Sequence, residues 1–485
     1  MNILFASSEV FPLIKTGGLA DVSAGLPLAL QKSGQDVRIV MPGYPQALAR
    51  GGRLQTVAEF EQDFPGRLLQ GRLPGSRLPV WFVDIPEYFQ RAGGPYATAS
   101  GLDWPDNAER FAAFSRVVCR LAQNRLGLDW PVDIVHTNDW QTGLVPALLS
   151  REKTRPASVF TIHNLAYQGL FPWESFAKLK LPQELWSVDG LEFHGRLSLL
   201  KGGLVFADQL TTVSPSYAQE IQTPQFGYGL EGLLRHRAKD LHGILNGVDY
   251  RQWNPARDPH LAANYSRSRP QGKRVNKQAL QQRFGLPQNA HIALVGMVGR
   301  MVEQKGFDLV LHALPWLLQQ PLQLVILGSG DKRLEHELLA ASQRHPGRIG
   351  VKIGYDEALA HLLEAGADIF LMPSRFEPCG LNQIYSQRYG TVPVVHRTGG
   401  LIDSVVDATP ETLAAGTATG FHFSPAEPEP LAQAMARAVE YYQQPEYWRR
   451  LMDAGMRADF SWQRSAAQYQ ALYEALLSHA AQQPG

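Results

Sequence analysis

A lysine and two glycines near the amino terminus have the types and spacing of an anion-binding loop. Lys15-Thr16-Gly17-Gly18-Leu19 follows an expected strand at residues 3–6 and opens an expected helix at residues 19–33. Paired glycines let backbone N–H groups approach an anion at a helix N-terminus, and Lys15 adds a full positive charge. The spacing matches neither a Walker loop nor G-x-G-x-x-G, so a tight turn with a solvated Lys15 is the alternative.

Two further cations, Arg300 and Lys305, lie between Gly299 and Gly306 after an expected strand at residues 292–298. Arginine binds a diphosphate through a bidentate fork, whereas lysine acts as a point charge. Taken alone, this run is better interpreted as a surface loop with ordinary charges. Together with Lys15, facing it across a cleft, it indicates a clamp on a diphosphate.

A carboxylate is placed in the run from Ser374 to Leu381, which follows an expected strand at residues 369–372. Glu377, followed by a proline and a glycine at a strand-to-helix turn, would be held rigidly, as recognition of sugar hydroxyls requires. A helix expected to start near Gly380 would direct its N–H groups to the same place, and Thr398-Gly399-Gly400-Leu401 supplies another glycine pair that opens a helix. Cys379 has the position of a nucleophile at a helix N-terminus, but the sequence around it offers no partner histidine for a protease.

Polar clusters end two expected strands of the first half, at residues 136–140 and 161–164. We expect both to point into the cleft. His136, Asp139 and His163 are possible metal ligands, but the sequence lacks a two-histidine helical spacing. The mixture of Asp, His, Asn and aromatic residues suits sugar binding better, so we predict no metal site.

Apolar strands alternate with amphipathic helices in both halves, which predicts an α/β protein with parallel sheets covered on both faces. Residues 246–287 break this rhythm and are interpreted as a linker. We expect domains at 1–250 and 251–460 and a helical segment at 461–485 that packs back on the first domain. The expected strands are at residues 3–6, 37–41, 80–83, 134–137, 159–162, 210–213, 292–298, 324–327, 351–353, 369–372 and 392–395, with a further helix at 109–125.

Composition narrows the class of protein further. The 485 residues carry a formal net charge of +1, which gives no overall attraction to nucleic acid or anionic lipid. Two cysteines exclude a disulfide framework. The first residues, MNILFASSEV, lack the basic region of a signal peptide, and no run of about 18 apolar residues predicts a membrane helix. We expect a soluble, cytoplasmic protein with neither nucleic acid nor membrane as partner.

Seven motifs together resemble the family of bacterial glycogen synthases and plant starch synthases. They occur in family order over nearly the whole chain, which makes the resemblance specific, although each alone would be weak. The motifs are KTGGL, HTNDW, TIHNLAYQG, NGVD, GRMVEQKG, SRFEPCGLNQ and RTGGL.

The resemblance implies a GT-B fold, with two Rossmann-like domains facing a deep interdomain cleft. It implies retaining transfer of glucose from ADP-glucose to the non-reducing 4-hydroxyl of an α-1,4-glucan, without a cofactor. The acceptor would bind the first domain and the donor the second. Lys15, Gly18, Arg300 and Lys305 would hold the diphosphate, and Tyr355 would stack on adenine. Glu377, beside Cys379 and Gly380, would recognise glucose hydroxyls, and Asp139, His163 and Asn246 would surround the transferred glucose.

The sequence departs from the pattern of many retaining GT-B enzymes at position 385, where Tyr385 replaces a ribose-binding Glu, as is common among glycogen synthases. Asn382 stands where the bacterial relatives often have Thr. A glucan phosphorylase is one alternative, but we see no lysine in a setting that suits pyridoxal phosphate. A glucan-binding protein without catalysis is another, and the choice between ADP- and UDP-glucose stays open.

Overall fold

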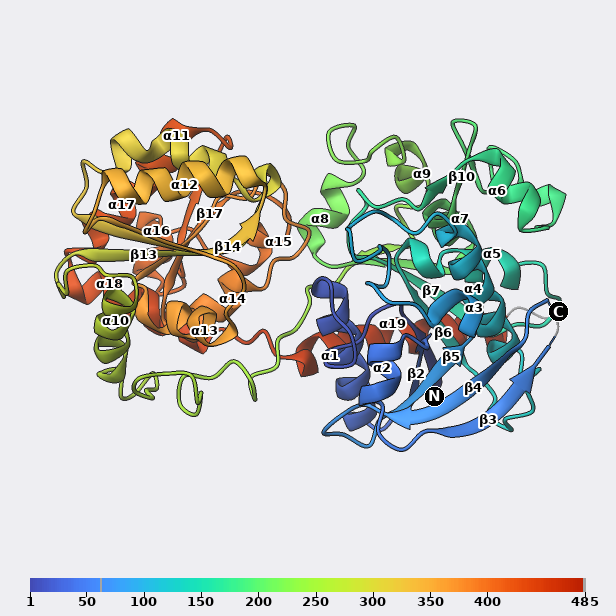
Figure 1. Cartoon of the computed structure of the whole chain (residues 1–485). Helices are drawn as coiled ribbons and strands as arrows, with labels where there is room; N and C mark the ends of the chain where they lie inside the picture. The colour runs from blue at the N-terminus through green and yellow to red at the C-terminus, as the bar shows by residue number, and fades with distance from the viewer. Residues whose placement is uncertain (62, 483–485) are drawn as a thin grey trace. The chain divides into compact units, whose positions relative to one another are not determined.

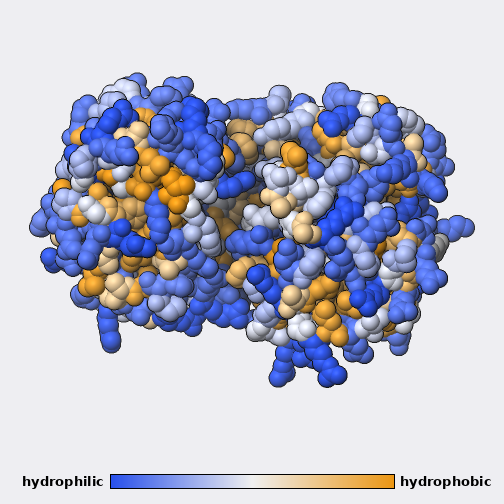
Figure 2. Space-filling model, in the orientation of Figure 1, coloured by the Kyte–Doolittle hydropathy of each residue, from blue (hydrophilic) through white to orange (hydrophobic). Residues whose placement is uncertain are grey.

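The computed structural model describes residues 1–61 and 63–482 and divides the chain into two compact units. Unit 1 comprises Met1–Gly247 together with Trp462–Gly485, and unit 2 comprises Val248–Ser461. Each unit has its own sheet and its own apolar core (Figure 1). No described helix combines the length and the apolar character needed to cross a bilayer. Hydrophilic side chains predominate over both units on the face drawn in Figure 2.

The main sheet of unit 1 has nine strands in the order β12-β11-β7-β6-β1-β2-β5-β4-β3, parallel from β12 to β5. The hairpin β3–β4 is antiparallel and extends one edge. These strands are β1 Asn2–Ala6, β2 Asp36–Pro42, β3 Gln55–Phe60, β4 Gly66–Arg72, β5 Pro79–Asp84, β6 Ile134–Asn138, β7 Ala157–Ile162, β11 Gln209–Thr212 and β12 Leu241–Gly243. A small second sheet is made of β8 Leu170–Phe171, β9 Glu192–Phe193 and β10 Arg196–Ser198.

The helices of unit 1 include one from the far end of the chain. They are α1 Gly18–Lys32, α2 Pro45–Arg50, α3 Pro86–Phe89, α4 Asn107–Ala122, α5 Leu144–Leu149, α6 Trp173–Lys178, α7 Leu199–Phe206, α8 Pro215–Glu220, α9 Glu231–His236 and α19 Trp462–Gln482, with short 3-10 turns η1 Trp140–Thr142 and η2 Gln183–Leu185. Helix α19 lies along α1 (Figure 1). Its buried side chains, Trp462, Ala466, Tyr469 and Tyr473, belong to the unit 1 core. The last residues of the expected segment, 483–485, lie outside the described part.

Unit 2 has a six-stranded parallel sheet in the order β15-β14-β13-β16-β17-β18. Its strands are β13 Ala293–Met301, β14 Leu322–Gly330, β15 Ile349–Ile353, β16 Ile369–Met372, β17 Val392–His396 and β18 Phe421–Phe423. Its helices are α10 Gly272–Arg283, α11 Phe307–Leu317, α12 Lys332–Arg344, α13 Glu357–Gly366, α14 Asn382–Arg388, α15 Gly399–Ser404, α16 Pro410–Ala414, α17 Pro428–Tyr442 and α18 Pro445–Arg457, with the turn η3 Glu303–Lys305.

Strand β13 shows why this sheet must be covered on both sides. Val295 packs into a core with α11, α12 and α17, whereas its neighbour Leu294 packs into a second core with α10 and α13. Because successive side chains of a strand point to opposite faces, a run of apolar residues needs helices on both. The predicted parallel α/β architecture is confirmed.

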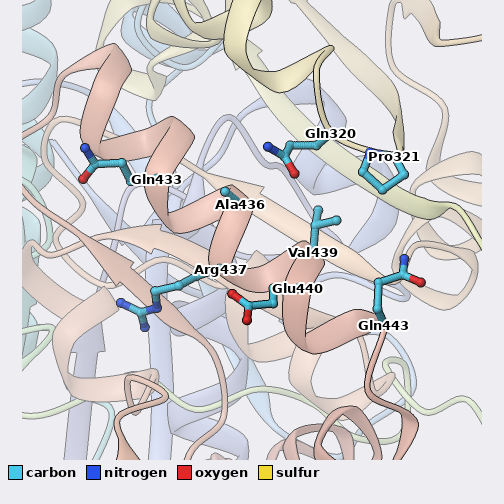
Figure 3. A pocket seen from close by; sticks show the side chains of 8 residues that line it. All are labelled: Gln320, Pro321, Gln433, Ala436, Arg437, Val439, Glu440 and Gln443. Atoms are coloured by element: carbon cyan, nitrogen blue, oxygen red, sulfur yellow. The ribbon is translucent and has the colours of Figure 1, made fainter.

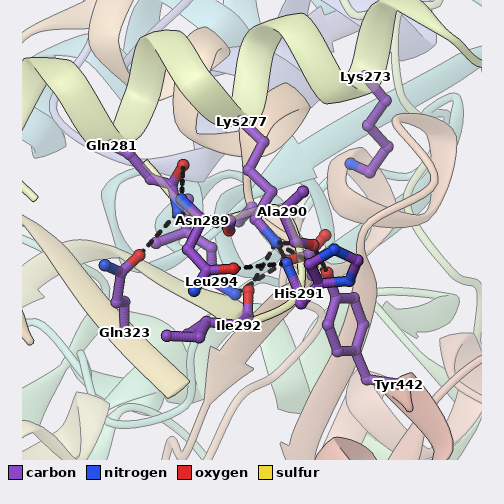
Figure 4. Close-up of polar contacts among 12 residues, drawn as sticks. Lys273, Lys277, Gln281, Asn289, Ala290, His291, Ile292, Leu294, Gln323 and Tyr442 are labelled. Carbon is purple, nitrogen blue, oxygen red and sulfur yellow. Dashed lines mark hydrogen bonds and ion pairs between the residues drawn. The ribbon is translucent and has the colours of Figure 1, made fainter. Parts of the chain in front are cut away.

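The prediction of a linker at residues 246–287 is wrong. Residues from Val248 onward belong to unit 2, and α10 packs on α13. Its buried face is polar: Lys277 Nζ donates to the carbonyl of Ile292 at 2.6 Å and pairs with Asp368 at 2.7 Å, and Gln281 donates to the carbonyl of Asn289 at 3.1 Å (Figure 4). A helix that buries long polar side chains against main-chain carbonyls has no apolar periodicity, so its sequence resembles a loop.

Candidate active site

Several of the predicted site residues lie beside the topological switch points of the two sheets, whereas Asn246 and Tyr355 follow the edge strands β12 and β15. In unit 2 the strand order reverses between β13 and β16, and in unit 1 it reverses between β1 and β6. Ligands of open α/β sheets bind beyond the carboxyl ends of the strands at such reversals. Arg300 lies at the end of β13 and Glu377 follows β16, whereas Lys15 follows β1 and Asp139 follows β6.

Glu377 and Lys305 form an ion pair beside the switch point of unit 2. Glu377 is buried, and its Oε2 lies 2.5 Å from Lys305 Nζ and accepts a hydrogen bond of 3.1 Å from Ser374 Oγ. Turn η3, which carries Lys305, ends at Gly306 with φ 74°, where an added Cβ would lie 2.2 Å from the carbonyl oxygen of Pro373. Only glycine fits there, so the approach of η3 to the loop after β16 depends on it.

The loop that carries Glu377 is fixed from several sides. The guanidinium of Arg375 grips the carboxylate of Asp308 through two bonds, of 2.8 and 2.6 Å, and the backbone N–H of Arg375 donates to the carbonyl of Gln304 at 2.8 Å. Bidentate pairs of this kind fix orientation as well as position. No sequence motif marks Arg375 and Asp308 as partners, because their pairing joins the loop after β16 to the first turn of α11.

The loop from Cys379 to Leu381 packs closely on the start of α15. Gly400 donates its N–H to the carbonyl of Glu377 at 3.1 Å, and a Cβ on it would lie 2.3 Å from the carbonyl oxygen of Cys379. Gly400 is therefore required for packing. Of the remaining predicted residues of these loops, Cys379 and Thr398 are buried, and Gly399 opens α15.

The helix expected near Gly380 begins later, at Asn382, because Gly380 has the left-handed φ of 71° and Leu381 is the N-cap. Asn382 Nδ2 donates to the carbonyl of Val298 at 3.1 Å and so fastens α14 to β13. Tyr385 stacks on Trp253, with ring centroids 3.9 Å apart and an interplanar angle of 7°. The departures from the family pattern at 382 and 385 thus have packing roles in this chain.

Arg300 and Tyr355 remain accessible. Arg300 is exposed at the end of β13, and Tyr355, between β15 and α13, is 86% exposed. An exposed aromatic ring offers an apolar face on which a planar ligand can stack. Both residues can therefore contact a ligand at the carboxyl end of the sheet.

In unit 1 the glycine loop is organised by Glu9, which lies outside all of the predicted motifs. The Glu9 carboxylate accepts hydrogen bonds from Thr16 Oγ1 at 2.5 Å, from the backbone N–H of Gly17 at 3.2 Å and from Tyr96 Oη at 2.5 Å. The available signal in the sequence was an acidic residue three positions after the first strand.

Lys15, Gly17 and Gly18 are exposed to solvent on this loop. Lys15 is exposed and pairs with Asp21 at 2.8 Å. A Cβ at Gly17 or Gly18 would meet nothing within 4 Å, so packing does not require glycine at either position. The missing side chains instead leave the start of α1, a 15-residue helix, open to an anion.

Asp139 is a strained and buried carboxylate. Its φ of 56° and ψ of −177° lie in a region that is almost confined to glycine, which costs about 1–3 kcal/mol. Its Oδ1 accepts the backbone N–H of His163 at 2.8 Å. Burial raises the pKa of Asp139 to about 7, against the lowering effect of backbone N–H groups of His163 and Asn164. Strain combined with a perturbed pKa is typical of functional positions.

His163 lies beside Asp139 in its neutral form, since burial lowers its pKa to about 3. Its Nε2 donates to Asn138 Oδ1 at 2.9 Å. Asn246, after β12, is buried, and its Oδ1 has no hydrogen-bond partner among the residues that the structure describes. A buried acceptor without a partner is costly and suits a ligand hydroxyl.

The expectation that His136 points into a cleft is wrong. His136 lies within β6, fully buried, where Nδ1 contacts Tyr473 Oη and Nε2 contacts Thr161 Oγ1, each at 2.6 Å. Burial lowers its pKa to about 3. Successive side chains of a strand point to opposite faces of the sheet, so nearness to the end of the strand does not by itself direct a side chain outward. His136 therefore fastens α19 to the sheet. Among residues 1–61 and 63–482, no group of three His, Cys, Asp or Glu side chains is placed to hold a metal ion.

Known proteins are similar to this chain over nearly all of its length. The model "Starch synthase catalytic domain" matches residues 2–236, and the model "Glycosyl transferases group 1" matches residues 278–451. Glycogen synthase 1 of Methylococcus capsulatus is 59% identical over 478 residues, covering 99% of this chain and 97% of the relative. Glycogen synthase of Thioalkalivibrio sulfidiphilus is 59% identical over 483 residues, covering 99% and 100%.

Solved structures agree. The catalytic domain of starch synthase IV from Arabidopsis thaliana, bound to ADP and acarbose, superposes with a TM-score of 0.88 at 35% identity, over 98% of this chain and 99% of that one. Sucrose-phosphate synthase from Thermosynechococcus elongatus has a TM-score of 0.58 at 18% identity, over 99% of both chains, which is a likeness of fold. The two Rossmann-like units define a glycosyltransferase of the GT-B class.

The chain belongs to the glycogen synthase family. It is a hexosyltransferase of glycogen biosynthesis.

Proposed function

We propose that this chain transfers glucose from ADP-glucose to the non-reducing-end 4-hydroxyl of an α-1,4-glucan and releases ADP, with retention of the anomeric configuration. The observation that carries the proposal is the Lys305–Glu377 pair at the switch point of unit 2, where a sugar nucleotide binds in such sheets. The relatives named glycogen synthase and the ADP in the Arabidopsis structure support it.

Unit 2 carries the donor in this proposal. Arg300 and Lys305 contact the diphosphate, and exposed Tyr355 stacks on adenine. Glu377 accepts hydrogen bonds from glucose hydroxyls, because its carboxylate is held in one orientation by Lys305 and Ser374. Lys305 has three N–H donors, so it can bind Glu377 and a phosphate oxygen together.

Unit 1 contributes the remaining contacts and carries the glucan. Lys15 and Gly18 also contact the diphosphate, at the open start of α1. Asp139, His163 and Asn246 surround the transferred glucose. A strained Asp139 is pre-organised, and the unpartnered Oδ1 of Asn246 is available to a sugar hydroxyl.

The chemistry follows from charge. Breaking the glycosyl–phosphate bond places negative charge on the leaving diphosphate while the sugar becomes oxocarbenium-like. Lys15, Arg300 and Lys305 stabilise that growing charge, and only stabilisation that is stronger in the transition state accelerates the reaction. Neutral His163 adds no positive charge that would oppose the developing sugar cation.

We further propose a same-face mechanism, in which the leaving phosphate takes the proton of the acceptor hydroxyl and the His163 region shields the opposite face. A double displacement needs a carboxylate free to attack. In unit 1, Asp139 and Glu9 are both engaged by backbone N–H groups. Trapping a glucosyl–enzyme ester on either residue during turnover would refute the same-face mechanism.

The test is glucose transfer from ADP-glucose and from UDP-glucose into glycogen, with and without primer, by the parent chain and by Glu377→Ala. The control Glu337→Ala removes a half-buried glutamate of α12 that pairs with Arg333 in the same helix. We expect Glu377→Ala to lose transfer by about 100-fold or more while circular dichroism stays unchanged. Full activity in Glu377→Ala would overturn the site assignment.

We place this reaction in the cytoplasm. Both cysteines, Cys119 and Cys379, are free and buried, which suits a reducing compartment.

A further inference from the structure

A groove runs along the outer face of α17, at the edge of unit 2 opposite the donor residues. One hollow, of about 500 Å³, lies between α17 and the segment Gln320–Pro321, just before the amino end of β14 (Figure 3). A second, of about 690 Å³, lies between α16, the end of α17 and α18. Arg437 and Glu440 line both hollows, so the two adjoin each other along α17. We call them together the α17 groove.

The ionic groups of the groove balance in number. Arg437 and Arg450 carry two positive charges, and Asp407 and Glu440 carry two negative ones. Arg437 is paired with Asp407 at 2.8 Å, and Arg450 with Glu446 at 2.7 Å. Phosphate recognition needs cations whose donors are aimed at the anion. Because both arginines are already paired, the groove instead favours a neutral ligand.

The uncharged polar groups of the groove suit a ligand with many hydroxyls. Gln320, Gln433 and Gln443 line the first hollow, and Gln444 and Thr409 line the second. Each carboxamide both donates and accepts hydrogen bonds, which matches a hydroxyl that does the same.

An aromatic platform completes the groove. Tyr447 is 41% exposed, and its ring meets that of Tyr441 at 76°, with centroids 5.9 Å apart. The guanidinium of Arg450 lies over the Tyr447 ring, 5.7 Å from its centroid, and both residues line the second hollow. A tyrosine ring with a wet hydroxyl can cover the apolar C–H face of a sugar while neighbouring amides bind its hydroxyls.

We propose that the α17 groove is a second, non-catalytic binding site for α-1,4-glucan. The proposal rests on the proposed function, because the polymeric acceptor is the neutral polyhydroxylated ligand that the enzyme meets. A branched glucan held in the groove raises the effective concentration of its other chain ends. The groove should therefore matter for glycogen and not for a short acceptor that fills only the catalytic site.

The test compares parent, Tyr447→Ala, Tyr447→Trp and the control Trp316→Ala. Trp316 is 47% exposed on α11 and lines neither hollow. Retardation in native gels containing glycogen measures binding without turnover, and initial rates give KM for glycogen and for maltotriose. We expect Tyr447→Ala to lose much of the retardation and to raise the KM for glycogen by about three- to tenfold, with kcat and the KM for maltotriose unchanged. Tyr447→Trp and Trp316→Ala should behave as the parent.

A second variant tests the other end of the groove without touching an aromatic residue. Gln433→Ala combined with Gln443→Ala should reduce retardation in glycogen gels. Retardation equal to that of the parent in Tyr447→Ala and in this double variant would overturn the proposal, as would an equal rise in KM for glycogen and maltotriose. If neither the parent nor any variant transfers glucose while retardation still depends on Tyr447, glucan binding in the α17 groove is supported and the proposed function fails.

Discussion

Replacing Asp139 by Asn should make the stability of unit 1 less dependent on pH. The native carboxyl group has a pKa of about 7, because burial disfavours its charge, whereas in the unfolded chain an aspartate titrates near 3.9. Between these values the native state binds more protons than the unfolded state, so stability falls as pH rises. The amide of the Asp139→Asn variant cannot titrate, so the variant should lack this loss.

The size of the effect follows from the same two pKa values. Each unit of pKa difference corresponds to about 1.4 kcal/mol. Raising the pH from 5 to 8 should cost the parent about 2–3 kcal/mol from this group alone. At pH 5 the native carboxyl is protonated and resembles the amide, but the unfolded carboxyl is already ionised, so Asp139→Asn should be more stable than the parent by about 1.5 kcal/mol. At pH 8 this advantage should have grown by about 2–3 kcal/mol more, to about 4 kcal/mol, while glucose transfer falls because the carboxylate is lost.

The assay is denaturant unfolding at pH 5 and pH 8, followed by tryptophan fluorescence. Asp189→Asn, which replaces an exposed aspartate of the same unit, is the control and should show no such pH-dependent gain. If the stability difference between parent and Asp139→Asn is the same at both pH values within about 0.5 kcal/mol, burial does not raise this pKa and the reasoning fails.

Three further outcomes are expected. Glu377→Gln, which keeps the shape but loses the ion pair with Lys305, should lower kcat by about 100-fold with unchanged circular dichroism; a kcat within twofold of the parent would contradict the pairing role. Tyr473→Phe leaves His136 Nδ1 without its partner and should destabilise unit 1 by about 1–3 kcal/mol in denaturant unfolding, and a loss below about 0.3 kcal/mol would show that this bond is unimportant. Glu9→Gln disturbs the hydrogen bonds that hold the glycine loop. This variant should raise the KM for ADP-glucose by about tenfold and leave the KM for glycogen unchanged. An unchanged KM for ADP-glucose would argue against the loop as a diphosphate contact.

The sequence predicted the parallel sheets well because their strands are buried runs with a simple pattern. Ile134 and Val135, for example, are wholly buried on opposite faces of β6, so the whole strand reads as apolar. The sequence did not reveal the hairpin β3–β4, because these two strands mix buried residues with exposed ones such as Glu59 and Arg67.

Site residues were predictable where local chemistry marked them and not where a distant partner decides their role. The glycine loop at Lys15 and the strand end at Asp139 carry their own signals. The anchoring role of Glu9 depends on Tyr96, 87 positions away, and His136 is drawn into the core by Tyr473, 337 positions away. Helix α10 was hidden because Lys277 and Gln281 bury themselves against carbonyl groups that only the folded chain brings near.

Unit 1 is made of two separate stretches, Met1–Gly247 and Trp462–Gly485, and this affects the order in which the chain folds during translation. Tyr469 and Tyr473 are wholly buried in the unit 1 core, yet they are translated after all 214 residues of Val248–Ser461. At about 5–20 residues per second, that stretch takes roughly 10–40 s to synthesise. During this interval the surface of the amino-terminal part that α19 will cover stays uncovered, and chaperones can bind it. Unit 2, whose residues are contiguous, can therefore finish folding before unit 1 does.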